Sequence, residues 1–475
     1  ILRTGYAEEN GELFQYIHPM ETLSLHRQSF ISEGIDTEDK VHQFLVEQAK
    51  KRFDLTSGHV IRSGLLEQGV EHYTFYLFIH HIAVDHAAIH QLSEELSVIY
   101  NTLSESLVLD MAEPDFQYVD YVMWQKEQAE SDMDGHGLAL WEKNLEGFSG
   151  ILDLPGNGSR PSFPSGDGAT HSFVLDKELS SLVAQFGRQQ ASSPYQVLLG
   201  ALKVLLARYS NQKDIIVGTP FSGRQDQEEL QNVMGCFINT LPIATQLDST
   251  ASFSDLLQKI KKGMLFAFEN QTTPFDQITH ACIKHRDLSY NPLFQVGFVF
   301  QEPPASFSLN NLQCSNIAFD NGAAMYDMHL WMWEADDQLH GDFTFSTDIF
   351  SIDDIDQLLS NFKVLIAALI KNPDASVFSV NILSDQDTDI LKKINTTQTD
   401  WPALSIPALI SANASKQGEA IAACFSNDVS LSYHSLESRS NQLANVLVEQ
   451  GVKPGDFVGL STERNEYMLL SLLAI

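Results

Sequence analysis

The sequence predicts a mixed α/β fold of the α+β type, in which helices and strands pack as layers. Residues Tyr73–Ile79 are mostly aromatic and aliphatic, a composition typical of a buried strand. The chain then changes to the three- and four-residue spacing of an amphipathic helix, carried by aliphatic residues from Ile89 to Ile99. The helical pattern Val197–Tyr209 and the apolar strand Asp214–Val217 repeat this change of period. Pattern alone therefore supports two layers of helices and strands.

The remaining elements follow from local signals. Strands Val60–Leu65 and His72–Val84 are joined through the Gly-containing break Glu67–Glu71, which predicts a hairpin. Ser351–Asp354 resembles a capping box, so we expect a helix from there to about Lys371. Further expected elements are a helix over Leu182–Phe186 and strands over Val296–Gln301 and His340–Phe345.

Composition narrows the class of protein. The chain has 475 residues, 43% of them hydrophobic, which is enough for packed cores. Its formal net charge is 29 − 62 = −33, and so acidic a surface argues against binding to nucleic acid or to anionic membranes. The four cysteines show no spacing typical of zinc sites or disulfide frameworks. We therefore expect buried, reduced thiols in a cytoplasmic protein.

Two adjacent histidines, His80 and His81, stand with Asp85 between the predicted strand and the helix that follows. Such junctions often carry chemistry. Neighbouring side chains of a strand point to opposite faces. If strand pairing continues, His81 shares a face with Leu77 and Ile79, so one histidine can face a cleft only while the other faces the scaffold. Taken alone, the residues fit two core histidines equally well.

This segment resembles the His-His-x-x-x-Asp-Gly motif of nonribosomal peptide synthetase condensation domains. Four more segments resemble family motifs in the expected order, over more than 200 residues in all. They are Tyr118–Gln125, Met234–Thr240, Asn270–Asp276 and Arg286–Val296.

The resemblance covers about residues 1 to 390. It implies two chloramphenicol acetyltransferase-like lobes in a V-shaped pseudodimer, with the active site between them. We assign residues 1–130 to the N-terminal lobe, 131–388 to the C-terminal lobe and 389–408 to a linker. Residues 409–475 resemble the start of an adenylation domain, an incomplete part of an adenylate-forming fold from which we expect no activation of an amino acid.

The opening residues Ile1–Gly5 resemble a Leu-Arg-Thr element that lies well inside a complete condensation domain. We therefore expect the first strand and long helix of the N-terminal lobe to be absent. Such an absence would leave an apolar surface uncovered and prone to aggregation.

The resemblance implies an acyltransferase that joins a carrier-bound donor thioester to the amine of a carrier-bound acceptor. The two substrates would arrive on phosphopantetheine arms of upstream and downstream peptidyl carrier domains. The condensation part would itself bind no cofactor or metal, whereas ATP and Mg²⁺ would serve only a complete adenylation domain. The family assigns the central role to the second histidine, His81. With a reference pKa of about 6.5, we expect its imidazole to be neutral near pH 7, acting as a base or as a positioning group.

His80 and Asp85 are expected to be architectural. A buried carboxylate needs a cation or backbone donors. By resemblance, Asp85 pairs with an arginine, for which Arg224 is the first candidate and Arg62 the second. The alternative is that Asp85 only caps the following helix.

One position departs from the family pattern, because His86 stands where the motif has Gly. The imidazole is either a harmless replacement, a group that narrows the acceptor channel, or a sign that condensation has been lost. Asn239, Asn291 and Pro292 could shape the cleft, although strand ends and turns are their simpler roles. We expect Trp124 to be a packing anchor, and Trp331 and Trp333 to line the donor side or an ordinary aromatic core.

Two rival functions remain. The chain could be a non-catalytic docking module that recruits a partner, or a carrier-independent acyltransferase that uses the same histidine. The two histidines and Asp85 favour catalysis, whereas His86 counts against it. The order of a condensation segment followed by an adenylation start favours an assembly-line module.

Overall fold

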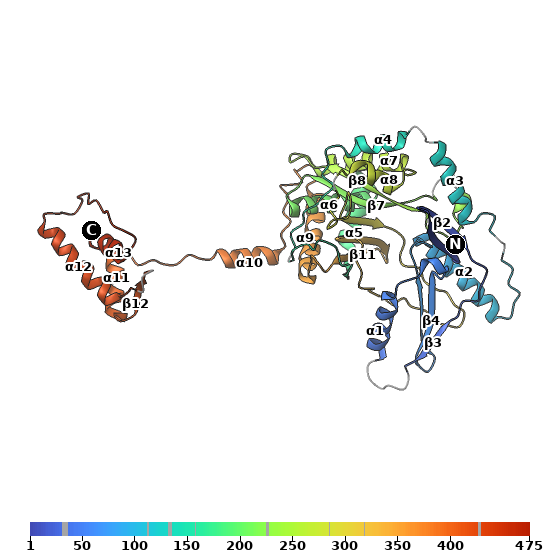
Figure 1. Ribbon diagram of the computed structural model, residues 1–475, viewed down its shortest axis with the longest axis horizontal. Helices are drawn as coiled ribbons and strands as arrows, with labels where there is room; N and C mark the ends of the chain where they lie inside the picture. Colours follow the sequence, from blue (N-terminus) through green and yellow to red (C-terminus); the bar gives the residue numbers. More distant parts are fainter. Residues whose placement is uncertain are drawn as a thin grey trace. The chain divides into compact units, whose positions relative to one another are not determined.

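The computed structural model describes residues 1–30, 37–111, 114–131, 135–156, 158–224, 228–284, 286–317, 319–425 and 429–475. The chain forms two compact units, residues 1–388 and residues 389–475 (Figure 1). Both units mix helices and strands, as the sequence predicts. Among the helices that the structure describes, none combines the length and apolar composition needed to cross a bilayer.

The first part of the larger unit contains two small sheets. In the described residues, strands β3, β4 and β5 form one sheet, with β3 parallel and β5 antiparallel to β4. A separate antiparallel pair joins β1 to β2. The elements are β1 (Thr4–Glu9), β2 (Glu12–Ile17), β3 (His26–Ser29), α1 (Thr37–Lys50), β4 (Ile61–Gly69), β5 (His72–Ile79), α2 (His86–Ser104) and α3 (Tyr118–Ser131).

The second part is built on a larger sheet, whose described strands run in the order β6-β11-β10-β9-β7-β8. Strands β7, β9 and β10 are parallel to one another, and the outer pairings are antiparallel. The elements are α4 (His136–Leu145), β6 (Gly168–Leu175), α5 (Lys177–Gln189), α6 (Pro194–Ser210), β7 (Asp214–Ser222), β8 (Ile238–Gln246), α7 (Phe253–Glu269), α8 (Phe275–Cys282), β9 (Val296–Phe300), β10 (Met328–Ala335), β11 (Gln338–Ser346), α9 (Ile352–Lys371) and α10 (Asp385–Asn395).

The main core lies between this sheet and its helices. Residues Val197–Ala207 of α6 are all buried, so this helix packs on every side. The capping box predicted at Ser351 and Asp354 opens α9, which ends at Lys371. Both features were readable in the sequence, and the predicted helix is confirmed.

The smaller unit contains α11 (Ile406–Gln417), β12 (Ile421–Cys424), β13 (Ser430–Ser432), α12 (Tyr433–Glu449) and α13 (Glu466–Ala474). Leu431, Leu436 and Leu470 form its buried centre. Helix α10 occupies the beginning of the stretch that we expected to be a linker. The Ser384 side chain accepts a hydrogen bond from the Asp387 backbone N–H (3.1 Å). This bond caps the start of α10, so the chain is helical there and not extended.

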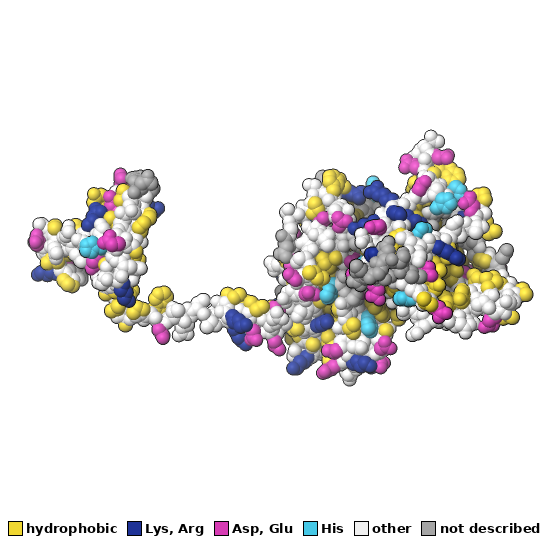
Figure 2. Space-filling model, turned by 90° about the horizontal axis from the view of Figure 1, so that it is seen from below, with side chains coloured by type: hydrophobic (Ala, Val, Ile, Leu, Met, Phe, Trp, Pro, Cys, Tyr) yellow, Lys and Arg dark blue, Asp and Glu magenta, His cyan; other side chains and the backbone are white. Residues whose placement is uncertain are grey.

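Apolar side chains are exposed on the N-terminal lobe. β2 and the residues after it expose Leu13, Ile17, Met20 and Leu23. Hydrophobic and acidic side chains are interspersed on the face of the molecule in Figure 2. An apolar surface of this kind favours self-association in water.

The predicted strand His72–Val84 is too long, because β5 ends at Ile79. The His80 N–H still donates to the Val60 carbonyl (2.9 Å), but the Ala83 N–H then turns back to the His80 carbonyl (3.0 Å). The condition for an alternation of faces at the two histidines is therefore not met, since His81 lies in a turn.

Asp85 ends this turn and is buried, with 3% of its surface exposed. Its side chain caps α2 by accepting a hydrogen bond from the Ala88 N–H (2.8 Å). The same carboxylate accepts hydrogen bonds from Arg224 (Nη2 to Oδ1, 3.1 Å) and from the Phe237 N–H (3.1 Å). The ion pair and the helix cap, which we posed as alternatives, are both present.

Arg224 is also buried, with 2% of its surface exposed. Besides Asp85, its guanidinium donates to the carbonyl groups of Leu230 (2.9 Å), Val233 (2.6 Å) and Gly235 (3.1 Å). The backbone N–H of Asp85 donates to the same Gly235 carbonyl (3.1 Å). These bonds fasten the turn before α2 to the segment that leads into β8.

Replacing Asp85 with Ala should lower the free energy of unfolding of the larger unit by about 3–5 kcal/mol, because Arg224 would stay buried without its counter-charge. Chemical denaturation followed by tryptophan fluorescence measures the loss. The matched control is Asp356→Ala, which removes an exposed partner of His171 and should cost less than about 1 kcal/mol. An Asp85→Ala protein as stable as its parent would contradict the structural role of the pair.

Candidate active site

His80 points into the scaffold. Its Nδ1 accepts a hydrogen bond from the Ile82 N–H (3.1 Å), and its ring meets Phe53 edge to face at 5.8 Å. Burial, followed by the neighbouring His81, lowers the pKa of His80. A neutral ring that accepts at Nδ1 holds the turn together, which is the architectural role that we expected from the sequence.

His81 is the more exposed of the two histidines. Its Nδ1 lies 3.7 Å from Sγ of Cys236, a contact between residues 155 positions apart. No hydrogen bond to Nε2 occurs among the described residues, so this nitrogen is available to a substrate. The turn thus presents one fixed imidazole, held on one side by a thiol.

The contact with Cys236 changes the expected charge of His81. The hydrogen bond to Cys236 is the largest of the causes that raise the pKa of His81, to about 9, while desolvation opposes it. We expected a neutral imidazole near pH 7, whereas this raised pKa favours the protonated form. Sequence reasoning missed the cause because it expected buried thiols. This expectation is wrong, since Cys236 is only half-buried while Cys314 and Cys424 are exposed.

Cys236 is half-buried and its backbone is fixed. The Tyr118 hydroxyl donates to the Cys236 carbonyl (2.8 Å). At the neighbouring Gly235, a Cβ atom would stand 2.2 Å from the Tyr118 ring, so only glycine fits beneath that ring. Tyr118 and Gly235 both belong to family-like motifs, and together they set the position of the thiol.

Arg62, the second candidate partner of Asp85, lies elsewhere. Its guanidinium donates to the carbonyl groups of Gln48 (3.0 Å) and Lys51 (2.7 Å) at the end of α1, and it stacks over Phe53 at 3.8 Å. A cation at a helix C-terminus satisfies free carbonyl groups. Arg62 therefore attaches α1 to β4 and does not pair with Asp85.

His86 is the first residue of α2 and has an ordinary backbone conformation. The side chain at the usual Gly position therefore requires no unusual backbone angle. Its ring lies 4.5 Å from the His90 ring and 5.8 Å from that of Trp331 on β10. Burial is the main cause that lowers the pKa of His86, followed by His90. His86 and Trp331 thus form one wall next to the turn that carries His81.

Asn239 has a structural position. Its amide donates to the carbonyl groups of Gln271 and Thr273 (2.8 Å each), and its oxygen accepts from the Phe275 N–H (3.3 Å). It ties β8 to the turn before α8. Trp124 stacks beside Tyr121, with ring centroids 5.8 Å apart, and packs against a buried apolar cluster as expected.

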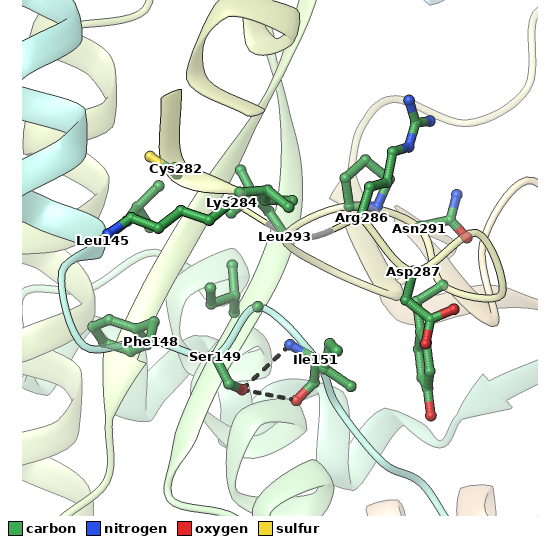
Figure 3. Close-up of a pocket in the computed structure, with 15 residues that line it drawn as sticks. Leu145, Phe148, Ser149, Ile151, Cys282, Lys284, Arg286, Asp287, Asn291 and Leu293 are labelled. Carbon is green, nitrogen blue, oxygen red and sulfur yellow. Dashed lines mark hydrogen bonds between the residues drawn. The ribbon is translucent and has the colours of Figure 1, made fainter. Parts of the chain in front are cut away.

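A separate pocket of about 210 Å³ lies between the residues after α4 and those after α8 (Figure 3). Asn291 and Pro292 line it, with Lys284 and Arg286 as its cationic residues. None of the residues from His80 to His86 lines this pocket, so it is distinct from the histidine site. No group of three metal-binding side chains occurs in the described residues.

Known proteins resemble this chain in sequence and in fold. The chain is 33% identical over its whole length to one of the linear gramicidin synthase proteins of Brevibacillus parabrevis, but spans only 6% of that relative. A crystal structure of a four-domain nonribosomal peptide synthetase covers 96% of the chain, with a TM-score of 0.82 and 21% identity, and the chain covers 35% of it. The first condensation domain of the calcium-dependent antibiotic synthetase covers 80% of the chain, which covers 87% of it, with a TM-score of 0.65 and 15% identity.

The two solved structures share the fold of the chain. Residues 410–475 match the AMP-binding enzyme family. Residues 1–391 match the condensation domain family, and because this match covers most of the 475 residues, the chain belongs to the condensation domain family.

Proposed function

We propose that this chain forms an amide bond between a donor acyl or peptidyl thioester and the amine of an acceptor aminoacyl thioester, as part of a nonribosomal peptide synthetase. The observation that carries the proposal is His81, an accessible imidazole on a turn fixed by the buried Asp85–Arg224 pair. Family membership and the gramicidin synthase relative support the same reaction.

A thioester is already activated, so the protein mainly has to orient two groups and exclude water. When the acceptor amine attacks the donor carbonyl, negative charge develops on the carbonyl oxygen. A protonated His81 can donate a charge-assisted hydrogen bond to this oxygen from Nε2. The amine proton then leaves with the departing thiolate. The raised pKa of His81 favours this stabilising role over that of a general base.

The substrates and partners follow from this proposal. Phosphopantetheine arms of upstream and downstream peptidyl carrier domains would deliver donor and acceptor, and the condensation part would need no cofactor of its own. ATP and Mg²⁺ would serve a complete adenylation domain. Such an assembly line operates in the cytoplasm.

His81→Ala should lower product formation by roughly 10²–10⁴-fold, the usual contribution of a positioned proton-transfer or hydrogen-bonding group. The assay incubates the chain with synthetic donor and acceptor pantetheine thioesters and measures the dipeptidyl product by mass spectrometry. His72→Ala is the control, because His72 is an exposed histidine at the far end of β5. Full activity of His81→Ala would replace the catalytic assignment with a docking function.

His86→Gly should keep or raise activity, since it removes a ring from the wall beside His81 and restores the residue usual in the motif. We expect the change mainly in KM for acceptor thioesters with bulky side chains. His86→Ala removes the same ring without adding backbone freedom, so it separates steric from conformational effects. A tenfold loss of kcat/KM in both variants would show that the imidazole itself is required.

A further inference from the structure

Cys236 and His81 form a thiol–imidazole pair. Sγ and Nδ1 lie 3.7 Å apart, and Cys236 is half-buried while His81 is exposed. A thiol becomes nucleophilic as a thiolate, and a neighbouring imidazole promotes this state by taking its proton. The amide-bond formation proposed above uses His81 but does not use the sulfur of Cys236.

Hydrogen bonds to the backbone hold the segment that carries Cys236. Cys236 lies between Gly235, whose carbonyl accepts from Asp85 and Arg224, and Phe237, whose N–H donates to Asp85. The Tyr118 hydroxyl fixes the Cys236 carbonyl. Backbone contacts on three consecutive residues thus fix the position of Cys236. None of these contacts involves its side chain, which reaches His81. A reactive side chain needs this kind of support.

Charged groups lie close to the sulfur, although Arg224 is already paired with Asp85. His81 supplies a cation in direct contact, and the guanidinium of Arg224 lies over the ring of the next residue, Phe237, at 4.0 Å. Burial is the main cause that raises the pKa of Tyr6 and of Tyr118, so both hydroxyls stay neutral.

We infer that Cys236 is a nucleophile of this site that accepts the acyl group of a thioester, with His81 as the group that holds its proton. The inference rests on the proposed function only for the class of substrate, an acyl-pantetheine thioester. The partially exposed thiol and the adjacent imidazole are independent of any condensation step.

The exchange balances without another reactant. In its neutral form His81 takes the proton of Cys236 at Nδ1, and Sγ bonds to the thioester carbonyl carbon. The carbon–sulfur bond of the pantetheine thioester breaks, and the departing thiolate takes the proton back from His81. One thioester is formed and one is consumed, so the step is close to thermoneutral.

The other cysteines serve as internal controls. Cys282 is half-buried, and burial raises the pKa of its thiol. Cys314 and Cys424 are exposed. If simple access governed acylation, the two exposed thiols would react first. If the imidazole contact governs it, Cys236 reacts first.

The test incubates the whole chain with acetyl-pantetheine at neutral pH, quenches it in acid and locates acetyl groups by peptide mass spectrometry. Neutral hydroxylamine removes S-acetyl but not N-acetyl groups, which identifies the thioester. We expect Cys236 to be acetylated at least tenfold faster than Cys314 or Cys424. His81→Ala should lower the rate at Cys236 by at least tenfold, and Cys236→Ser should remove the label there without changing the circular dichroism spectrum. The Cys314→Ala and Cys424→Ala variants should keep it.

Iodoacetamide provides a second reading that involves no thioester. Alkylation of Cys236 should be faster in the parent than in His81→Ala, while alkylation of Cys424 should be equal in both. Equal acetylation of all exposed thiols, or a rate at Cys236 that is indifferent to His81→Ala, would overturn the inference.

The two proposals fail separately. Formation of the dipeptidyl product at full rate by Cys236→Ala, with no acetyl group found on Cys236 of the parent, overturns the nucleophile and leaves the condensation function intact. Acetylation of Cys236 that depends on His81, in a chain that makes no dipeptidyl product, supports the nucleophile and overturns the condensation function.

Discussion

The buried pair of Asp85 and Arg224 is the interaction on which the site depends. It joins two segments 139 residues apart and leaves almost none of either side chain exposed. A carboxylate is costly to bury unless every lone pair is used, and here the cap of α2, the Phe237 N–H and the guanidinium use them. The Asp85 side chain therefore caps α2 at the end of the turn, and it binds the segment before β8 to this junction.

The position of the reactive groups follows from this pair. The turn from His80 to Asp85 is short and bonded at both ends, to the Val60 and Gly235 carbonyl groups. His81 is thereby presented outward, while its Nδ1 meets the thiol on the partner segment. Orientation is the main requirement for aminolysis of a thioester, and a turn fixed by buried charge supplies it with little motion.

The wall beside the turn is built from aromatic contacts, whereas the turn itself is fixed by the charged Asp85–Arg224 pair. His86, His90 and Trp331 meet through ring contacts from two elements, with centroid distances of 4.5 and 5.8 Å within the group. Ring contacts of this type give shape more than charge, because burial lowers the pKa of His86 and favours its neutral form. The Asp85–Arg224 pair holds the site in place, and the rings of His86, His90 and Trp331 form a wall beside it.

The sequence by itself determined the class of fold, the helix from Ser351 to Lys371 and the motif that holds His81, because these depend on local periodicity, capping and residue order. The family resemblance implied the pairing of Asp85 with an arginine, since buried-charge reasoning alone left backbone donors as an alternative. Only the tertiary structure decided that this arginine is Arg224 and that Arg62 serves α1 instead. Likewise, only the fold brings Cys236 to His81 across 155 residues and changes the charge expected on the imidazole. Contacts between distant segments depend on how the whole chain packs, and no local pattern encodes them.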